Sequence, residues 1–359
     1  MKLTRFVAAA AISLGLALCA APLAYAEEAT PAPSAPAPAP EPLKVTFDAS
    51  GGQFGNGAAT VTNDWAVGQK LPNIATPSRA SFTFNGWYIG STKVTPGSTV
   101  PSNTGSFVVW ASWSPKDRVA VVFDENGGSG VGDRLVKPGA KIGTLPTPKR
   151  AGFTFMGWYT ADHGGTLYNK NKKVAKKAGY LYLHAQWAPN AMFQSDGKWS
   201  KNPYMTTIGN SGCGPSAASI VARAFGTADG ASWQTPATAA SFMLANGYAT
   251  MDYSVAKTTS AGMIAYLGTY GLKVTETTSA WQAESAVRSG NVVIARMNPG
   301  FWTQHKHYIV WYDISGSKAL VRDPNGTKAS KTANTMANLK KQAQTYFIVE
   351  IPYEKRIAQ

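Results

Sequence analysis

The pattern of apolar and polar positions divides the chain into a strand-rich half and a mixed half. Between residues 45 and 187, short runs alternate apolar and polar side chains and are separated by Gly, Asn and Pro, which is typical of β-strands. Beyond residue 213 the period lengthens, and one helical face carries Ala217, Ile220, Val221, Ala224 and Phe225. Further helices are predicted at 236–246, 260–270 and 279–290, and strands at 292–297, 308–314, 319–322 and 346–351. Helices followed by strands predict an α+β domain with a mainly antiparallel sheet.

The strand-rich half repeats itself. VTFDASGG at 45–52 matches VVFDENGG at 121–128, and PSRASFTFNGWY at 77–88 matches PKRAGFTFMGWY at 148–159. The offset is 76 residues, so the chain carries two copies of one small unit. The Asn-Gly-Gly segments favour hairpins, and the tryptophan of each GWY motif is predicted to anchor a core.

This pattern resembles the internalin B-repeat, or Listeria–Bacteroides repeat, of bacterial surface proteins. The F-D-x-N-G-G opening and the G-W-Y centre are both present. The first copy departs from it, with Ser50 in place of the Asn and Ala80 in place of the glycine seen as Gly152. The resemblance implies β-grasp-like modules that act as spacers or adhesive elements and carry no chemistry of their own.

The start of the chain is typical of an exported protein. A short basic start and an apolar run end in small residues at Ala24-Tyr25-Ala26, which predicts a signal peptide over 1–26. Cys19 leaves a lipid anchor as an alternative, although Leu18 before it is larger than such sites need. The alternating Ala and Pro of 27–43 predict a semi-rigid linker. We expect a secreted protein, extracellular or attached to a bacterial cell wall, with no transmembrane segment after cleavage.

The net charge of +15 suggests acidic partners. For an exported chain these would be anionic cell-wall polymer, or a glycan or protein of a host surface, and not nucleic acid. The basic run over 170–177 is interpreted as a solvated loop. The four histidines and the single cysteine outside the signal peptide offer no ligand cluster, so no metal and no other cofactor is expected.

That single cysteine, Cys213, stands in NSGCGPSAAS, at the predicted start of a helix. Pro215 suits the first helical turn, where its missing N–H is not needed. A helix N-terminus stabilises a thiolate, but a lone cysteine before a helix is usually a small buried apolar residue, so a reactive thiol is expected only if partner groups accompany it. Gly212 and Gly214 are expected to leave room for a substrate carbonyl.

A reactive thiol needs a base and a group that orients it. His307 opens a predicted strand, and Asp323 follows the next one. Neighbouring antiparallel strands bring the start of the first beside the end of the second, which predicts contact between His307 and Asp323. His305 is the weaker candidate for the base, and Asp313 and Asn325 are alternatives for the orienting group.

Residues 192 to 351 resemble the bacteriocin-leader-processing (double-glycine peptidase-like) cysteine peptidases of the papain-like superfamily. The matching features are a glutamine in FQSDGKW, Cys-Gly-Pro entering a helix, a histidine heading a strand and a later Asp-Pro. The resemblance implies Cys213 as nucleophile, His307 as general base and acid, Asp323 as orienting residue and Gln194 as oxyanion donor. Gln194 lies 19 residues before the cysteine, farther than papain-type spacing, and a surface amide is the alternative. Unlike the transporter-fused members, the chain has no P-loop motif, so bacteriocin export is not implied.

Together these features predict a surface-associated thiol hydrolase that cleaves a peptide or amide bond, in peptides, proteins or cell-wall peptides. A non-enzymatic adhesin with a degenerate peptidase fold and a transglutaminase-like acyltransferase are the alternatives. The predicted organisation is a signal peptide (1–26), a linker (27–43), two β-rich repeats (44–114 and 119–188) and an α+β papain-like cysteine peptidase domain (192–353).

Overall fold

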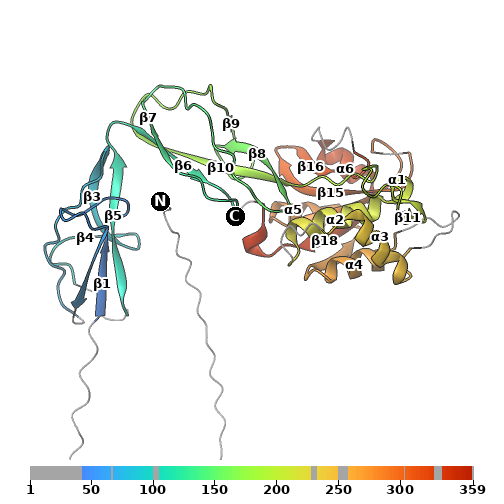
Figure 1. Ribbon diagram of the computed structural model, residues 1–359, viewed down its shortest axis with the longest axis horizontal. Helices are drawn as coiled ribbons and strands as arrows, with labels where there is room; N and C mark the ends of the chain where they lie inside the picture. Colours follow the sequence, from blue (N-terminus) through green and yellow to red (C-terminus); the bar gives the residue numbers. More distant parts are fainter. Residues whose placement is uncertain are drawn as a thin grey trace, which may run out of the picture. The chain divides into compact units, whose positions relative to one another are not determined.

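The computed structural model describes residues 43–357 except 66–67, 100–104, 228–232, 250–257, 303 and 327–333. The expected signal peptide and nearly all of the expected linker lie outside the described residues. The chain forms two compact units, Met1–Arg118 and Val119–Gln359 (Figure 1). Within the described ranges, no helix is long and apolar enough to cross a membrane.

Each repeat is one five-stranded sheet, and the two sheets have the same topology. In both, the first strand pairs in parallel with the last strand of the unit at the centre of the sheet. The order is β2-β1-β5-β3-β4 in the first repeat and β7-β6-β10-β8-β9 in the second. The strands are β1 (Leu43–Asp48), β2 (Thr60–Trp65), β3 (Phe82–Ile89), β4 (Thr92–Val94), β5 (Phe107–Pro115), β6 (Val119–Asp124), β7 (Arg134–Val136), β8 (Phe153–Tyr159), β9 (Leu167–Tyr168) and β10 (Gly179–Pro189).

Tryptophans account for the repeated glycine motif. In the second repeat, Trp187 Nε1 donates to the Glu125 carbonyl at 2.9 Å, and a Cβ on Gly128 would meet that indole at 2.5 Å. The second glycine of the motif therefore makes room for a ring that closes the hairpin. The predicted anchors Trp87 and Trp158 are 7% and 1% exposed, which confirms them as core residues.

The backbone corrects one detail of the repeat alignment. Gly152 has φ +80°, and in the first repeat the residue with this left-handed conformation is Ser81 (φ 65°), which also directly precedes the phenylalanine of β3. Ser81, and not Ala80, is therefore the counterpart of Gly152. Ser50 and Asn126 match as expected, with φ 48° and 52°.

The C-terminal part is an α+β domain with an antiparallel sheet, as the sequence predicts. The sheet order is β13-β18-β14-β15-β16-β17, and every pair in it is antiparallel. Its strands are β13 (Lys273–Thr277), β14 (Val292–Met297), β15 (His307–Ser315), β16 (Lys318–Arg322), β17 (Asn334–Thr335) and β18 (Ala343–Glu350), with a small hairpin of β11 (Pro203–Tyr204) and β12 (Thr206–Thr207). The helices are α1 (Ile208–Ser211), α2 (Cys213–Phe225), α3 (Pro236–Ala245), α4 (Ser260–Gly268), α5 (Ala280–Arg288), α6 (Met336–Gln342) and a 3₁₀ turn at Tyr353–Lys355.

Helix starts follow local capping chemistry. Thr235 caps α3 and shares a reciprocal capping box with Thr238. Ser279 caps α5 by accepting from the Gln282 backbone N–H, as predicted. The Gln282 side chain accepts instead from the Thr277 hydroxyl, so only half of the expected box forms there.

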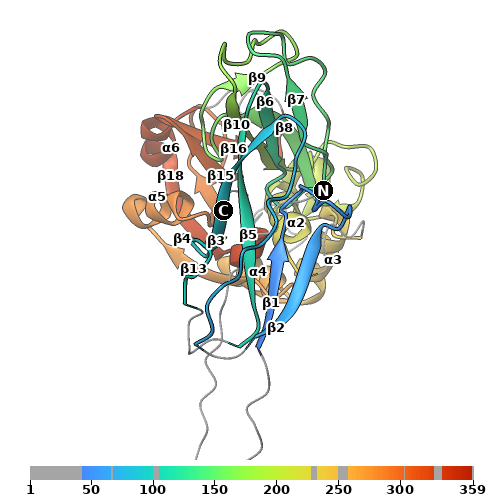
Figure 2. The ribbon, with the colours of Figure 1, turned by 90° about the vertical axis from the view of Figure 1, so that its left-hand side faces the viewer.

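The sheet is covered on both faces, because successive residues of a strand point to opposite sides. On β15, Tyr308 and Val310 pack into the core that contains α2, α3 and α4. Ile309 and Trp311 pack into a second core with α5 and α6. Figures 1 and 2 show the sheet between these two helical layers. Burial on both faces explains why β15 reads as a nearly continuous apolar run.

The second repeat docks directly on this domain. Phe153 of β8 packs edge-on against Phe225 of α2, with ring centroids 5.2 Å apart. Arg150 Nη2 donates to the carbonyls of Lys355 and Arg356, both at 2.8 Å. A Cβ on Gly152 would meet the backbone of the last turn of α2 at 2.6 Å, so the left-handed glycine also permits close approach. The second repeat and the α+β domain therefore share one continuous core.

Two further contacts reach the sheet itself. Arg322 Nε, at the end of β16, donates to the Pro189 carbonyl at 2.6 Å. His163 Nδ1, in the second repeat, lies 3.0 Å from Asp313 Oδ1 on β15. The repeat thus contacts α2 and β15, which begin with Cys213 and His307, and β16, which is followed directly by Asp323.

Candidate active site

Cys213 is the first residue of α2, directly after the cap residue Gly212. Nearly all later residues of α2 are buried, so the helix is fixed in the core while its first residue reaches the surface. Cys213 forms no disulfide, and the residue is half-buried. The backbone N–H groups of Gly214 and Tyr308 donate hydrogen bonds to the sulfur. The predicted placement of the thiol at a helix N-terminus is confirmed.

The flanking glycines have a different role from the expected one. A Cβ on Gly214 would lie 2.1 Å from Thr258 Oγ1, and a Cβ on Gly212 would lie 2.5 Å from the Ile208 side chain. The space beside each glycine is therefore filled by the protein. These glycines permit close packing around the thiol and do not open a path for a substrate carbonyl.

His307 and Asp323 form the predicted pair. His307 Nε2 lies 2.6 Å from Asp323 Oδ1, and the two side chains are 5% and 6% exposed. The pair arises from the β15–β16 hairpin, in which Val310 faces Arg322, so the start of one strand meets the end of the other. The backbone N–H of Asn325 also donates to Asp323 Oδ1 at 2.8 Å and fixes the carboxylate.

The His307 imidazole also bonds the thiol. Since Nε2 faces Asp323, the bond to Cys213 uses the other ring nitrogen, Nδ1. His307 therefore hydrogen-bonds Cys213 through one ring nitrogen and Asp323 through the other. Burial alone raises the pKa of Cys213, but the hydrogen bond and charge of His307, with the two backbone N–H groups, outweigh it and lower that pKa. Burial lowers the pKa of His307, but its bonds to Asp323 and Cys213 prevail and raise it to about 10.

The residues considered as alternatives to His307 and Asp323 either lie away from the thiol or have a different role. Asp313 faces His163 of the second repeat and not His307, so it is wrong as an orienting residue. Asn325 contributes its backbone N–H to Asp323. His305 is exposed, two residues before the strand that fixes His307.

Gln194 is buried, at 6% exposure, which excludes the interpretation as a surface amide. Its backbone N–H donates to the Pro324 carbonyl at 2.8 Å, next to Asp323. Its Nε2 donates to the Gly209 carbonyl at 2.8 Å, four residues before Cys213. A carboxamide nitrogen carries two hydrogens, so one N–H remains after this bond. The side chain is thus anchored between the turn after β16 and the entry to α2.

Three residues near the thiol had no signal in the sequence. The Tyr204 hydroxyl lies 2.6 Å from Thr258 Oγ1, and the Tyr308 hydroxyl donates to the Thr258 carbonyl at 3.0 Å. Burial raises the pKa of both tyrosines, and the charge of Cys213 acts in the same direction. They remain neutral hydroxyls that hold Thr258 against Gly214. In the described part of the chain, no three His, Cys, Asp or Glu residues are grouped as a metal site would require.

Family models match both parts of the chain. The model described as Listeria-Bacteroides repeat domain matches residues 44–111 and 120–186. The model described as Peptidase_C39 like family matches residues 190–349. The resemblances expected from the sequence are therefore confirmed, as is the fold class of two β-rich repeats followed by an α+β peptidase-like domain.

Two solved structures are similar to part of the chain. One is the peptidase domain of Streptococcus ComA, a bi-functional ABC transporter involved in a quorum sensing pathway; it is 13% identical, with a TM-score of 0.29, over 40% of this chain and 93% of that one. The other is a C39-like peptidase from Bacillus anthracis, 12% identical, with a TM-score of 0.28, over 45% of this chain and 98% of that one. At these levels of similarity neither structure bears on the substrate.

Proposed function

We propose that the chain is a secreted cysteine peptidase of papain-like type that hydrolyses a peptide or amide bond. The observation that carries the proposal is the line from the Cys213 thiol through His307 to Asp323. The thiol lies at the N-terminus of a buried helix, and the imidazole has a buried carboxylate 2.6 Å away. This arrangement stabilises a thiolate beside an imidazolium, which is the reactive pair of a thiol hydrolase.

The reaction begins with attack of the Cys213 thiolate on the substrate carbonyl carbon. The carbonyl π electrons move to oxygen, and the resulting oxyanion accepts hydrogen bonds from the Cys213 backbone N–H and the remaining N–H of Gln194 Nε2. His307 then gives its Nδ1 proton to the leaving amine as the C–N bond breaks. The products of this half are the free amine and a thioester on Cys213.

Water completes the cycle. Neutral His307 removes a proton from a water molecule, whose oxygen attacks the thioester carbonyl and releases the acid. The C–S bond breaks, the thiolate returns and the imidazole is again protonated. Throughout, Asp323 holds Nε2–H and keeps Nδ1 directed at the sulfur, while Asn325 holds Asp323.

The two repeats and the net positive charge indicate where the protein acts. Listeria–Bacteroides repeats and the predicted signal peptide support attachment at a bacterial surface. Loss of Lys2 and Arg5 with the signal peptide changes the net charge from +15 to +13, which still favours anionic cell-wall polymer or an acidic host glycan or protein as partner. A peptide, a protein or a cell-wall peptide is the substrate class. The second repeat acts less as a spacer than as part of the catalytic body, because it packs on α2.

Mass spectrometry of a peptide library digested by the protein tests the proposal. We expect Cys213→Ala and His307→Ala to abolish cleavage, a loss of at least about a thousandfold. His305→Ala is the matched control, since it removes an exposed histidine two residues away, and it should leave cleavage unchanged. Full cleavage by Cys213→Ala would refute the mechanism, as would no cleavage by the wild type. Added amine that appears in the products would assign acyl transfer in place of hydrolysis.

A further inference from the structure

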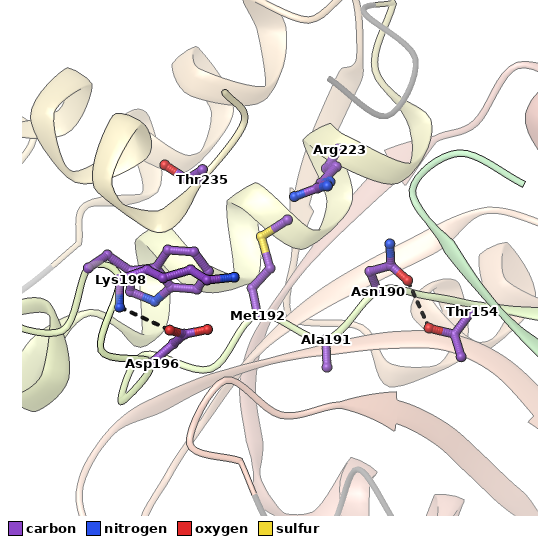
Figure 3. Close-up of a pocket in the computed structure, with 9 residues that line it drawn as sticks. Thr154, Asn190, Ala191, Met192, Asp196, Lys198, Arg223 and Thr235 are labelled. Atoms are coloured by element: carbon purple, nitrogen blue, oxygen red, sulfur yellow. Dashed lines mark hydrogen bonds between the residues drawn. The ribbon is translucent and has the colours of Figure 1, made fainter. Parts of the chain in front are cut away.

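A pocket of about 590 Å³ lies where the second repeat meets the α+β domain (Figure 3). Its walls come from both sides of this junction. The second repeat and the connector after it contribute Thr154 and residues 190–192, and the α+β domain contributes the rest: Asp196, Lys198, Trp199, Arg223 and Thr235. The volume falls within the range of small-ligand pockets. It lies at the end of α2 opposite to Cys213, since Arg223 belongs to the last turn of that helix.

Hydrogen-bond donors dominate the lining. The Thr154 hydroxyl donates to Asn190 Oδ1 at 2.8 Å, and this bond fixes the orientation of the amide. Figure 3 shows the Asn190 oxygen turned toward Thr154 and its amide nitrogen turned away. That nitrogen carries two hydrogens for a ligand. Asn190 therefore presents donors, and its acceptor is already used.

Arg223 supplies the charge. Its Nε is buried and has no hydrogen-bond partner among the described residues. Because this Nε is enclosed, a carboxylate in the pocket would bind the outer nitrogens of the half-buried Arg223 side chain, and a carboxylate is the anion with which a guanidinium pairs best. Lys198 adds a second positive charge, whereas Asp196 is the single acid and already accepts from the Lys198 backbone N–H at 3.0 Å.

Two of the remaining lining residues, Met192 and Trp199, are large and buried. Met192 is 3% exposed and Trp199 is 9% exposed, and Trp199 Nε1 already donates to the Phe193 carbonyl. An aromatic ring and a thioether suit the carbon atoms of a peptide better than the uniformly polar backbone of a phosphate polymer. Hydrogen-bond donors, positive charge and the buried side chains of Met192 and Trp199 together suit a peptide that carries acidic side chains.

We propose that this junction pocket binds an acidic peptide segment, with a carboxylate on Arg223 and a backbone carbonyl or second carboxylate oxygen on Asn190 Nδ2. The pocket needs the second repeat, because Thr154 lies on β8 and orients Asn190. Docking of the repeat thus creates a binding site that the α+β domain alone would lack. Binding at this site does not require the proposed chemistry at Cys213.

Isothermal titration of the whole chain carrying Cys213→Ala tests the site, because that variant cannot consume the peptide. The probe is an end-capped tetrapeptide with two glutamates, compared with the same peptide carrying two glutamines. We expect the glutamate peptide to bind at least about tenfold more tightly, since hydrogen bonds between charged groups contribute this much. Equal affinity for both peptides, or binding of neither, would overturn the proposal.

Two substitutions and one control locate the binding. Arg223→Met keeps the aliphatic stem and should weaken the glutamate peptide about tenfold or more. Asn190→Asp keeps an acceptor for Thr154 but replaces the donors by a negative charge, and should weaken binding by a similar factor. Lys341→Met removes the same charge from an exposed position on α6 and should have little effect. Circular dichroism confirms that each variant is folded.

The combined results distinguish binding in this pocket from non-specific attraction of an acidic peptide to a positively charged protein. Equal weakening by Lys341→Met and Arg223→Met would assign the binding to net charge and overturn the site. Displacement of the peptide by inorganic phosphate at equal concentration would indicate a general oxyanion site and would also overturn it. Intact peptide binding together with no hydrolysis by the wild type would support this pocket while refuting the proposed peptidase function.

Discussion

Removal of the second repeat should destabilise the α+β domain, whereas removal of the first should not. The perturbation is a pair of shortened chains, one beginning at residue 119 and one at residue 190. The first keeps the whole of the compact unit Val119–Gln359. The second exposes the face of α2 that Phe153 covers and takes away the acceptor of Arg322 Nε.

The contacts set the size of the effect. Full burial of a phenylalanine contributes about 1.5–3 kcal/mol, so uncovering one face of Phe225 costs about 1 kcal/mol. The hydrogen bond from the charged Arg322 to the Pro189 carbonyl contributes about 1.5–3 kcal/mol more. The pair between His163 and Asp313 adds little, because the histidine is 40% exposed. These two contacts together contribute about 2.5–4 kcal/mol, a large part of the 5–15 kcal/mol that is typical of domains.

Thermal unfolding followed by circular dichroism is the assay. At about 2–4 °C per kcal/mol for a domain of this size, the chain from residue 190 should melt roughly 10 °C below the chain from residue 119. The chain from residue 119 should match the full-length protein in its main transition. Melting temperatures within 2 °C of one another for the two shortened chains would refute the reasoning that the repeat stabilises the domain.

Other substitutions test the site. Asp323→Asn keeps the shape of the side chain but removes the negative charge next to His307 Nε2. The pKa of His307 should then fall, and that of Cys213 should rise, by about 1–3 units. The rate of Cys213 alkylation as a function of pH measures both changes. An unchanged alkylation profile would argue against the pair. Gly214→Ala should lower stability by about 1–3 kcal/mol in thermal melts, because its Cβ would meet Thr258 at 2.1 Å. Gln194→Glu should lower kcat about 10²-fold with little change in KM, and an unchanged kcat would remove it from the oxyanion site.

The pattern of hydrophobic residues was sufficient to predict the main helices and strands of the α+β domain. Helix α2 was predictable because its apolar period, Pro215 and the flanking glycines agree with one another. The contact between His307 and Asp323 was predictable because a two-strand antiparallel hairpin fixes which ends meet. Strand β13 and helix α6 were missed, since each is short and largely exposed and so lacks a strong apolar period.

The features that could not be predicted from the sequence depend on contacts between segments that are distant in the chain. Nothing in the sequence near Gly214 indicates that Thr258 fills its empty side, because the two residues meet only in the folded chain. Docking of the second repeat depends on Arg150 reaching carbonyls more than 200 residues away, and no local period encodes such a contact. The burial of Gln194 likewise follows from its bond to the Pro324 carbonyl, across the domain.

In the proposed mechanism Cys213 is a thiolate held by the imidazolium of His307. The most direct test of this ion pair is the rate of alkylation by iodoacetamide from pH 4 to 11, with the alkylated residue identified by mass spectrometry. The pKa of Cys213 is lowered and that of His307 is raised to about 10, so the ion pair should persist from below the ordinary cysteine range up to about pH 10. Alkylation should therefore already be fast below the ordinary cysteine pKa, and the rate should change again only near pH 10, where the imidazolium loses its proton. In His307→Ala the early reaction should disappear. A single titration near the ordinary cysteine pKa of about 8.5, the same in wild type and His307→Ala, would show that His307 does not stabilise the Cys213 thiolate.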